Sequence, residues 1–318
     1  MKRFFLFVAA LAAAGAAAAQ SFPSRTVTIV VPYPPGGLID LVARILQPRF
    51  QAELGTNVVI DNKSGAGGNV GAEAVARATP DGHTLLLANP SLGISPAMYP
   101  KLPYSPLKDL GYVGIYGTVP NVLVVIPSVP ANSVQELVAY LRKNPGRLNY
   151  ASPGYGTSPQ MSMELFKAMT NTFIVHIPFR GSGPAQAAML AGETQLMFDN
   201  LPPQLPHIKA GKVKALAVTS LKRSSAAPDV PTLDESGLKG YEVTAWFGLA
   251  APAGTPRVNI LKLNQALNRA TADKQVHDAL VSRGATVIQE SPEYATRFVQ
   301  NEVTKWAPVV KRAGVVPD

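Results

Sequence analysis

The stretch "VPYPPGGLIDLVAR", Val31–Arg44, decides the fold because it leaves an extended run and enters a helix through Pro-Pro-Gly-Gly. The preceding "RTVTIVV" predicts a strand from Thr26 to Val31. After it, apolar residues recur at helical spacing: Leu38, Leu41, Val42, Ile45 and Leu46. The loop is either ordinary turn chemistry or a place where free backbone amides and a helix N-terminus hold an anion.

The same order of strand, loop and helix recurs along the chain. "NVVIDN", "HTLLLAN", "LNYAS", "IVHIPF", "TQLMFDN" and "VKALAVTS" predict strands. "GNVGAEAVARA", "SVQELVAYLRKNPG", "PQMSMELFKAM" and "PAQAAMLAG" predict helices. This alternation predicts an α/β fold in which each lobe is a mostly parallel sheet flanked by helices.

Two long extended segments divide the chain. They are "YVGIYGTVPNVLVVIPS", broken at Pro120, and "YEVTAWFGLAAP", which starts at Tyr241 and precedes three helices. We expect a second lobe, residues 121–246, inserted into a discontinuous first lobe, residues 20–120 plus 247–318. The crossings, near 119–122 and 244–248, would act as hinges that let the lobes close on a ligand.

The first residues predict export. Lys2 and Arg3 precede a short apolar run, and Ala17 and Ala19 have the spacing of a cleavage site, so Met1–Ala19 is predicted to be a cleaved signal peptide. A membrane anchor is disfavoured because the run is shorter than the roughly 20 residues that span a bilayer. The chain has 0 cysteines, which excludes disulfides, thiolate sites and a lipid anchor on cysteine. We therefore expect a periplasmic protein without a lipid anchor; release to the medium would look the same.

The charge pattern argues against nucleic acid. The formal net charge is +9, and it is +7 without Lys2 and Arg3, but the basic residues are scattered singly. A nucleic-acid surface would cluster them among aromatic residues. A weakly basic surface that steers small anions fits better.

Three loops share one plan, in which a strand ends, glycines and small polar residues follow, and a helix begins: "PYPPGGLID", "ASPGYGTSPQ" and "FRGSGPAQ". We expect Ser158 to cap the second helix with Pro159 as its first residue, and Pro184 to start the third. One helix N-terminus contributes only about 0.3–1 kcal/mol to anion binding. Micromolar affinity needs about 8 kcal/mol, so a site requires several loops from both lobes.

Other polar and aromatic candidates each have two interpretations. Asp40 either stabilises the first turn of its helix or orients the preceding loop and accepts from a ligand. Asp199 either caps the next turn or faces the cleft, and Arg180 either is solvated or pairs with a ligand carboxylate. Phe179, Trp246 and Phe247 either wall a pocket or pack in the core.

Catalytic, metal and cofactor motifs are weak. None of the histidines, His83, His176, His207 and His277, has metal-ligand spacing with another. "SGAGGNVG" is one residue longer than the dinucleotide fingerprint and follows the second strand, so its glycines are interpreted as close helix packing. We expect no catalytic residue, metal or cofactor. The rival is an exported hydrolase that uses Ser152 or Ser158 with His176.

Taken in order, six segments resemble the solute-binding proteins of tripartite tricarboxylate transporters, the Bug family. They cover nearly all of the chain after Ala19: "FPSRTVTIVVPYPPGGLIDLVAR", "NKSGAGGNVGAEAVARATPDGHTLLLAN", "SPGYGTSPQMSMELF", "IPFRGSGPAQAAMLAGETQLMFDNLPPQLPHIKAGKVKALAVTS", "PDVPTLDESG" and "WFGLAAPAGTP". The resemblance implies a hinged, two-lobed periplasmic-binding-protein fold of type II. It also implies a receptor, not an enzyme, that captures a small carboxylate and delivers it to membrane permease subunits. The sequence does not address the oligomeric state, for which a monomer is the default expectation.

The resemblance also implies that backbone amides and ordered waters at two glycine-rich loops hold the carboxylate. From their positions in the sequence, and not from the resemblance, we expect Leu38, Asn89, Ser91, Phe179, Arg180 and Asp199 to select the rest of the ligand. The candidate ligand-binding residues are Tyr33, Pro35, Gly36, Gly37, Leu38, Asp40, Asn89, Ser91, Ser152, Gly154, Gly156, Thr157, Ser158, Phe179, Arg180, Gly181 and Asp199. Leu38 stands where the family usually has a small residue, and Gln160 where it usually has a histidine. The ligand itself stays open, as does a role as a ligand-presenting sensor for a membrane regulator.

Overall fold

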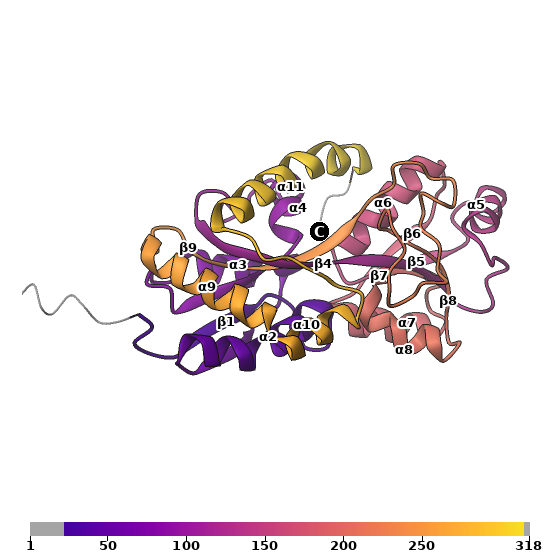
Figure 1. The fold of residues 1–318 in the computed structure, drawn as a ribbon. Helices are drawn as coiled ribbons and strands as arrows, with labels where there is room; N and C mark the ends of the chain where they lie inside the picture. The colour runs from indigo at the N-terminus through magenta and orange to yellow at the C-terminus, as the bar shows by residue number, and fades with distance from the viewer. Residues whose placement is uncertain (1–21, 315–318) are drawn as a thin grey trace, which may run out of the picture.

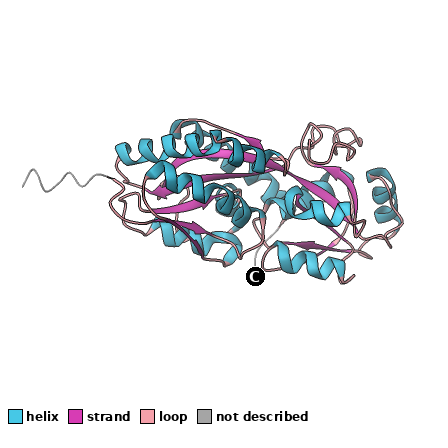
Figure 2. Ribbon diagram, turned by 60° about the horizontal axis from the view of Figure 1, so that its bottom comes forward, coloured by secondary structure: helices cyan, strands magenta, loops and turns pink. Residues whose placement is uncertain are grey.

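The computed structural model describes residues 22–314 as an elongated α/β chain with two lobes (Figure 1). Strands run through the middle of both lobes and helices cover them (Figure 2). The predicted signal peptide, Met1–Ala19, lies outside the described residues. Within residues 22–314, no helix is both long and apolar enough to cross a membrane.

The sheet of the first lobe has the order β2-β1-β3-β9-β4, with β10 also paired to β4. Its strands are β1 (Val27–Val31), β2 (Val58–Asn62), β3 (Thr84–Ala88), β4 (Leu110–Val125), β9 (Thr244–Pro252) and β10 (Thr286–Val287). β1 pairs parallel with β2 and β3, as the alternation of strands and helices predicts. β9 and β4 run antiparallel to their neighbours, so the sheet as a whole is mixed.

The second lobe continues from the same long strand β4. Its other strands are β5 (Asn149–Ser152), β6 (Val175–Pro178), β7 (Leu196–Asn200) and β8 (Lys214–Val218). β5 pairs parallel with β6 and β7, whereas β7 and β8 pair antiparallel with β4. The parallel part again follows the strand and helix alternation, and the antiparallel part comes from β4.

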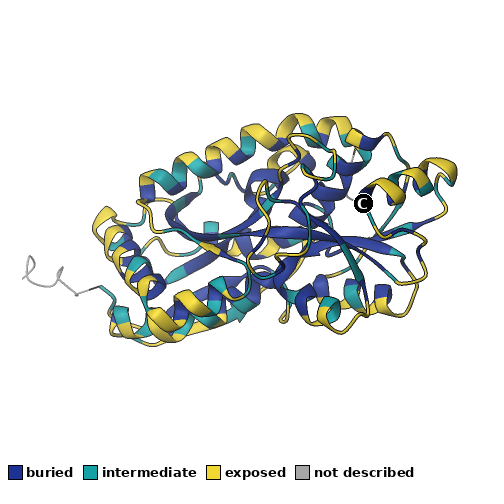
Figure 3. Cartoon of the chain, turned by 45° about the vertical axis from the view of Figure 1, so that its right-hand side comes forward, coloured by how far each residue is buried: buried dark blue, intermediate teal, exposed yellow. Residues whose placement is uncertain are grey.

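Helices cover both faces of each sheet, and their outer faces are exposed (Figure 3). Those around the first lobe are α2 (Leu38–Leu54), the short η1 (Ala66–Gly68), α3 (Asn69–Ala76), α4 (Ser91–Met98), α9 (Arg257–Ala272), α10 (Lys274–Val281) and α11 (Pro292–Ala313). Those of the second lobe are α5 (Val134–Lys143), α6 (Ser158–Thr170), α7 (Ser182–Leu190) and α8 (Leu201–Lys209). The sequence pattern does not predict α4 and α8, because "SLGISPAM" and "LPPQLPHIK" contain prolines, which argue against a helix.

Alternating side chains explain how each sheet is sandwiched. In β1, Val27, Ile29 and Val31 are fully buried in a cluster that includes α2, α9 and α10. Val30 points to the other face, into a cluster with α3 and α11. In the second lobe, Leu123 of β4 faces the α5 and α6 side. Its neighbour Val124 faces the α7 and α8 side.

Two strands and one helix connect the lobes. β4 continues through Pro120, where the sequence suggests a break, because Pro120 forms the last pair of the β4–β9 ladder and the partners change at Asn121. A missing N–H is tolerated where a ladder ends. α11 begins on the first lobe, and its Trp306 packs into the core cluster of the second. The predicted division of the chain at residues 120/121 and 246/247 stays a prediction.

Both tryptophans of the chain lie near this crossing. The indole N–H of Trp246 in β9 donates to Glu302 Oε2 (3.1 Å), and that of Trp306 donates to the same oxygen (3.0 Å). Trp246 and Phe247 are fully buried in core clusters, so they do not wall a pocket. The tryptophan fluorescence of this protein therefore reports on the segment that joins the lobes.

Candidate functional site

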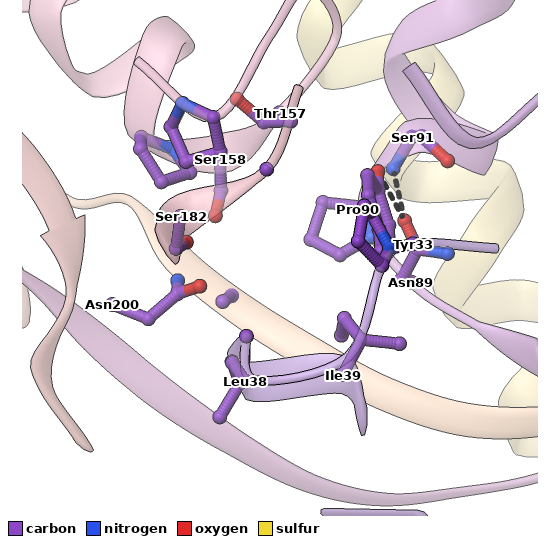
Figure 4. Close-up of a pocket in the computed structure, with 16 residues that line it drawn as sticks. Tyr33, Leu38, Ile39, Asn89, Pro90, Ser91, Thr157, Ser158, Ser182 and Asn200 are labelled. Atoms are coloured by element: carbon purple, nitrogen blue, oxygen red, sulfur yellow. Dashed lines mark hydrogen bonds between the residues drawn. The ribbon is translucent and has the colours of Figure 1, made fainter. Parts of the chain in front are cut away.

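An inner cavity, partly open to solvent, lies between the lobes, and the centre of a water-sized sphere can occupy about 50 Å³ of it. Figure 4 places Thr157, Ser158, Ser182 and Asn200 on one side of it and Asn89, Pro90 and Ser91 on the other. It is lined by Tyr33, Pro34, Gly37, Leu38, Ile39, Asn89, Pro90, Ser91, Pro153, Thr157, Ser158, Pro159, Gly181, Ser182, Asn200 and Ala245. None of these lining residues carries a formal charge, so backbone and neutral side-chain groups supply every polar contact.

Five helices begin at the inner cavity. The N-cap residues of α2, α4, α6, α7 and α8 all line it: Gly37, Pro90, Thr157, Gly181 and Asn200. The first N–H groups of a helix have no intrahelical partner, and the helix dipole places partial positive charge at this end. These ends favour an anion, but to different degrees. In α4 the first N–H groups already donate to Asn89 and Pro90, and in α8 two of the first residues, Pro202 and Pro203, have no N–H.

The β1–α2 loop is held in shape by Asp40. Its Oδ2 accepts from the Gly36 N–H (3.1 Å) and from Arg44 Nε (2.9 Å), and its Oδ1 accepts from Asn62 Nδ2 (3.0 Å). Burial alone would raise the pKa of Asp40, but the hydrogen bonds from Arg44, Asn62 and Gly36 outweigh it and lower the pKa. The carboxylate is therefore ionised at neutral pH and positions the loop, since it does not line the cavity.

Tyr33 connects this loop to its neighbours. Its hydroxyl lies 2.9 Å from the Gly67 carbonyl oxygen and 3.2 Å from Asn89 Oδ1. Asn89 Oδ1 in turn accepts from the Ser91 N–H (3.1 Å) at the start of α4. Burial raises the pKa of Tyr33, so the phenol stays neutral. The hydrogen bonds of one tyrosine thus fix three segments of the first lobe around the cavity.

The β5–α6 loop brings glycines and a cap from the second lobe. Thr157, one residue before the expected Ser158, is the N-cap of α6; its hydroxyl accepts from Gln160 N (3.4 Å) and donates to the Gly154 carbonyl (2.8 Å). Gln160 Oε1 accepts from the Gly156 N–H (2.8 Å). Gly154 has φ +127° and Gly156 has φ +73°, which side chains disfavour.

The β6–α7 loop meets the first lobe directly. Gly181, with φ +106°, precedes α7, so this helix starts at Ser182 and not at Pro184. A Cβ on Gly181 would lie 3.4 Å from Pro34 of the first lobe. Ser182 lines the cavity, and its hydroxyl donates to Asp199 Oδ1 (3.0 Å).

Asp199 is fully buried behind the cavity wall and accepts four hydrogen bonds. Oδ1 accepts from Ser182 Oγ and from the Asn200 N–H (2.8 Å). Oδ2 accepts from the amides of Gln186 (2.7 Å) and Gln204 (3.1 Å). Burial raises the pKa of Asp199 although these donors oppose the shift. Asp199 thus positions two lining residues, Ser182 and Asn200, without facing the cleft.

An outer cavity, in which the centre of a water-sized sphere can occupy about 560 Å³, adjoins the inner one and shares Tyr33, Pro34, Pro153 and Gly181 with it. Its further lining residues are Ser64, Gly65, Ala66, Gly67, Gly68, Tyr99, Gly154, Tyr155, Pro178, Phe179 and Arg180. Arg180 is exposed and is the one charged residue among the described residues that line this cavity. The outer cavity therefore carries a cation where the inner cavity has none.

A family comparison gives this geometry a context. The sequence model of the tripartite tricarboxylate transporter family receptor matches residues 42–315. The chain belongs to this receptor family. It is 37% identical to Protein BugT of Bordetella pertussis over 311 residues, which covers 97% of this chain and 95% of BugT.

Solved structures of related receptors share the fold. The periplasmic binding protein BugD is 36% identical, with a TM-score of 0.89, and the match covers 93% of this chain and all of BugD. MatC of Rhodopseudomonas palustris, solved with bound malate, is 38% identical, with a TM-score of 0.87 and 91% of this chain covered. The two-lobed periplasmic-binding-protein fold expected from the sequence is thereby confirmed.

Within this receptor, the predicted site residues fall into three groups. Those that line the inner cavity are Tyr33, Gly37, Leu38, Asn89, Ser91, Thr157, Ser158 and Gly181. Those of the outer cavity that are not in the first group are Gly154, Phe179 and Arg180. Those that line neither are Pro35, Gly36, Asp40, Ser152, Gly156 and Asp199. Direct ligand contact stays a prediction for the first two groups.

Several lining residues of the receptor were not predicted. Ser182 follows the predicted residue Gly181, and Asn200 follows the predicted residue Asp199. The sequence does not show that a helix begins at each of these places, and that start is what turns Ser182 and Asn200 toward the cavity. Ile39, Pro90 and Ala245 are apolar, and nothing in the sequence around them indicates that they line a binding site. Two residues differ from the usual family pattern. Leu38 is buried and lines the inner cavity, whereas Gln160 does not line it and accepts a hydrogen bond from the Gly156 N–H.

The serine and histidine named for a hydrolase do meet. Ser152 Oγ lies 2.6 Å from His176 Nε2, and Ser152 Oγ also accepts from the Gly154 N–H (3.2 Å). Burial lowers the pKa of His176 to about 4, with a smaller contribution from Lys167. The hydroxyl is fully buried and lines neither cavity. The pair therefore supports the β5–α6 loop of the receptor from inside.

Metal binding finds no support in the part of the chain that the structure describes. No group of three or more His, Cys, Asp or Glu side chains there is placed to hold an ion.

Proposed function

We propose that this protein is a periplasmic solute receptor that binds a small carboxylate in the inner cavity and delivers it to the permease of a tripartite tricarboxylate transporter. The observation that carries the proposal is the convergence of five helix N-termini on an uncharged cavity between two lobes. An anion there needs no lysine or arginine to neutralise it.

The energies have the required size. The positive end of a helix dipole resides on the free N–H groups, so the helix-end energy and the hydrogen-bond energy are not added. Each charge-assisted hydrogen bond contributes about 1.5–3 kcal/mol, so the roughly 8 kcal/mol of micromolar binding needs about three to five of them. One loop alone falls short, which explains a site built from both lobes.

Hydroxyl groups at the wall of the inner cavity suit a polar occupant. Ser91 and Ser158 are buried and line this cavity, one from each lobe. The Ser91 hydroxyl also interacts with the Tyr33 hydroxyl, so it already has a partner in the protein. MatC, a relative with bound malate, is consistent with a carboxylate as the ligand.

Transport follows from hinge motion. We propose that residues 121–246 move as a second lobe against residues 20–120 plus 247–318, with the crossings near 119–122 and 244–248 as hinges. Ligand contacts from both lobes stabilise the closed form, and the permease recognises that form. Met1–Ala19 would direct the chain to the periplasm and be cleaved. The mature protein is expected to be a monomer.

A hydrolase is the second candidate because Ser152 and His176 lie within hydrogen-bond distance. A histidine with a pKa of about 4 is a weak general base at neutral pH, and the buried hydroxyl lines neither cavity. A fluorophosphonate probe at millimolar concentration should therefore label nothing. Labelling that is lost in Ser152→Ala would favour the hydrolase.

A thermal-shift screen tests the receptor proposal. Malate, straight-chain mono- and dicarboxylates, aromatic acids, amino acids and the amide of each acid are compared, and hits are measured by calorimetry. The proposal predicts a shift with at least one carboxylate and none with its amide. A shift with a neutral sugar only, or with acid and amide alike, would contradict it. A sensor would give the same shifts, and loss of uptake in a permease deletion distinguishes transport.

A further inference from the structure

The glycine segment Ser64–Gly68, "SGAGG", is the motif that the proposed function leaves unexplained. It lies between β2 and α3 of the first lobe and lines the outer cavity. A Cβ built on Gly67 would lie 2.3 Å from the carbonyl oxygen of Tyr155, in the β5–α6 loop of the second lobe. Backbone thus approaches backbone across the two lobes, closer than any side chain permits.

Gly67 makes the tightest of the glycine contacts between the lobes in residues 22–314. A Cβ on Gly181 would lie 3.4 Å from Pro34, one on Gly156 would lie 3.7 Å from its nearest neighbours, and one on Gly37 would lie 4.0 Å from Ser182. Those three distances are ordinary contacts. A Cβ on Gly284 would lie 2.6 Å from Ser224 Oγ of the second lobe, but that neighbour is the end of a side chain. At 2.3 Å, an alanine at position 67 forces the two loops apart by about 1 Å, because the neighbour is a backbone carbonyl and cannot rotate away.

Each side of this contact is tied to a loop of the inner cavity. Tyr33 Oη lies 2.9 Å from the Gly67 carbonyl oxygen, and Tyr33 belongs to the loop that ends at the N-cap Gly37. On the other side, Tyr155 stands between Gly154, whose carbonyl accepts from Thr157, and the N-cap Thr157 itself. The contact therefore joins one anion-binding loop of each lobe.

We propose that the absence of a side chain at Gly67 is what lets the β5–α6 loop lie against the first lobe, so that the arrangement of the inner cavity seen here depends on glycine at this position. The consequence for affinity rests on the proposed function. The consequence for the distance between the lobes does not, since it needs no ligand.

The test compares Gly67→Ala with Gly55→Ala. Gly55 has φ +67°, almost equal to +64° at Gly67, but nothing lies within 4 Å of its Cβ position. Both variants therefore carry the same backbone strain, and only Gly67→Ala meets the Tyr155 carbonyl. Tyr33→Phe is a second variant that keeps the ring and removes the hydroxyl that holds Gly67.

Small-angle X-ray scattering of the full mature protein, without ligand and with saturating malate, gives the radius of gyration of each variant. We expect the radius of gyration of Gly67→Ala to be larger than that of Gly55→Ala in at least one of these states, and that of Tyr33→Phe to increase as well. We also expect Gly67→Ala to release malate about tenfold faster than Gly55→Ala, as followed by tryptophan fluorescence. Equal scattering of Gly67→Ala and Gly55→Ala in both states would overturn the proposal. If neither the unmodified protein nor any variant binds malate, the radii of gyration of Gly67→Ala and Gly55→Ala without ligand still decide the question.

Discussion

Replacement of Asp199 tests how the cavity wall is supported. Asp199→Ala removes the acceptor of four hydrogen bonds and leaves three donors buried, on Ser182, Asn200 and Gln204. An unsatisfied buried donor costs about 1–3 kcal/mol, so the gross cost is roughly 3–9 kcal/mol. Relief of the carboxylate's desolvation returns several kcal/mol of this. We expect a net loss of about 3 kcal/mol in the free energy of unfolding.

Asp199→Asn is the matched control because it has the same shape. The amides of Gln186 and Gln204 can turn so that their oxygens accept from the introduced carboxamide, and the loss should be about 1 kcal/mol. Ser182 and Asn200 then keep their places, so affinity should be retained in Asp199→Asn and reduced in Asp199→Ala.

The pH dependence adds a second readout. Because the pKa of Asp199 is raised by folding, the folded state binds the proton more tightly than the unfolded state. The contribution of Asp199 to stability therefore falls as the pH rises from about 4 through its raised pKa. This slope should be absent in Asp199→Asn. Urea unfolding at several pH values measures both quantities, and a cost below about 1 kcal/mol for Asp199→Ala would refute the network as a support.

Three further predictions concern the loops. Gly37→Leu should abolish carboxylate binding in calorimetry, because Gly37 lines the inner cavity. The melting temperature should fall by only a few degrees, because φ is −84° at this position and a side chain fits that backbone conformation. Loss of the fold would show that this glycine serves the turn alone. Arg180→Ala should weaken binding of a dicarboxylate about tenfold more than Arg147→Ala, as measured by calorimetry, because Arg180 lines the outer cavity. Arg147→Ala is the control, since it removes the same charge from an exposed site outside both cavities. Equal losses of affinity would mean that Arg180 only attracts anions through its long-range charge. Folding lowers the pKa of His176 to about 4, so stability should fall by up to about 3 kcal/mol as the pH drops from 6.5 to 4, and His176→Asn should lack this part of the pH slope in urea unfolding.

The sequence predicts the strands and most helices well because their patterns are local. β1 and α2 follow from the apolar spacing on either side of Pro-Pro-Gly-Gly. α4 and α8 escape prediction because they contain Pro96 and Pro206 away from their first turns, and proline argues against a helix in a local pattern. Their stability comes instead from tertiary packing, which no window of sequence contains.

The site was predictable in part for the same reason. Glycine loops followed by helices indicate three of the five N-termini, whereas those at Pro90 and Asn200 depend on the two unpredicted helices. Asp40 is explained by its sequence position, since Gly36 and Arg44 are four residues away on either side. Asp199 is not, because Ser182 and Gln186 reach it only through the pairing of β7 with β5.

A crystal structure of the complex with the carboxylate that gives the largest thermal shift would show where the ligand carboxylate binds. We predict one carboxylate group in the inner cavity, within about 3.2 Å of backbone N–H groups at helix N-termini of both lobes, and with no arginine or lysine nitrogen on that group. A ligand carboxylate held by Arg180 in the outer cavity, with the inner cavity filled by solvent, would contradict this prediction.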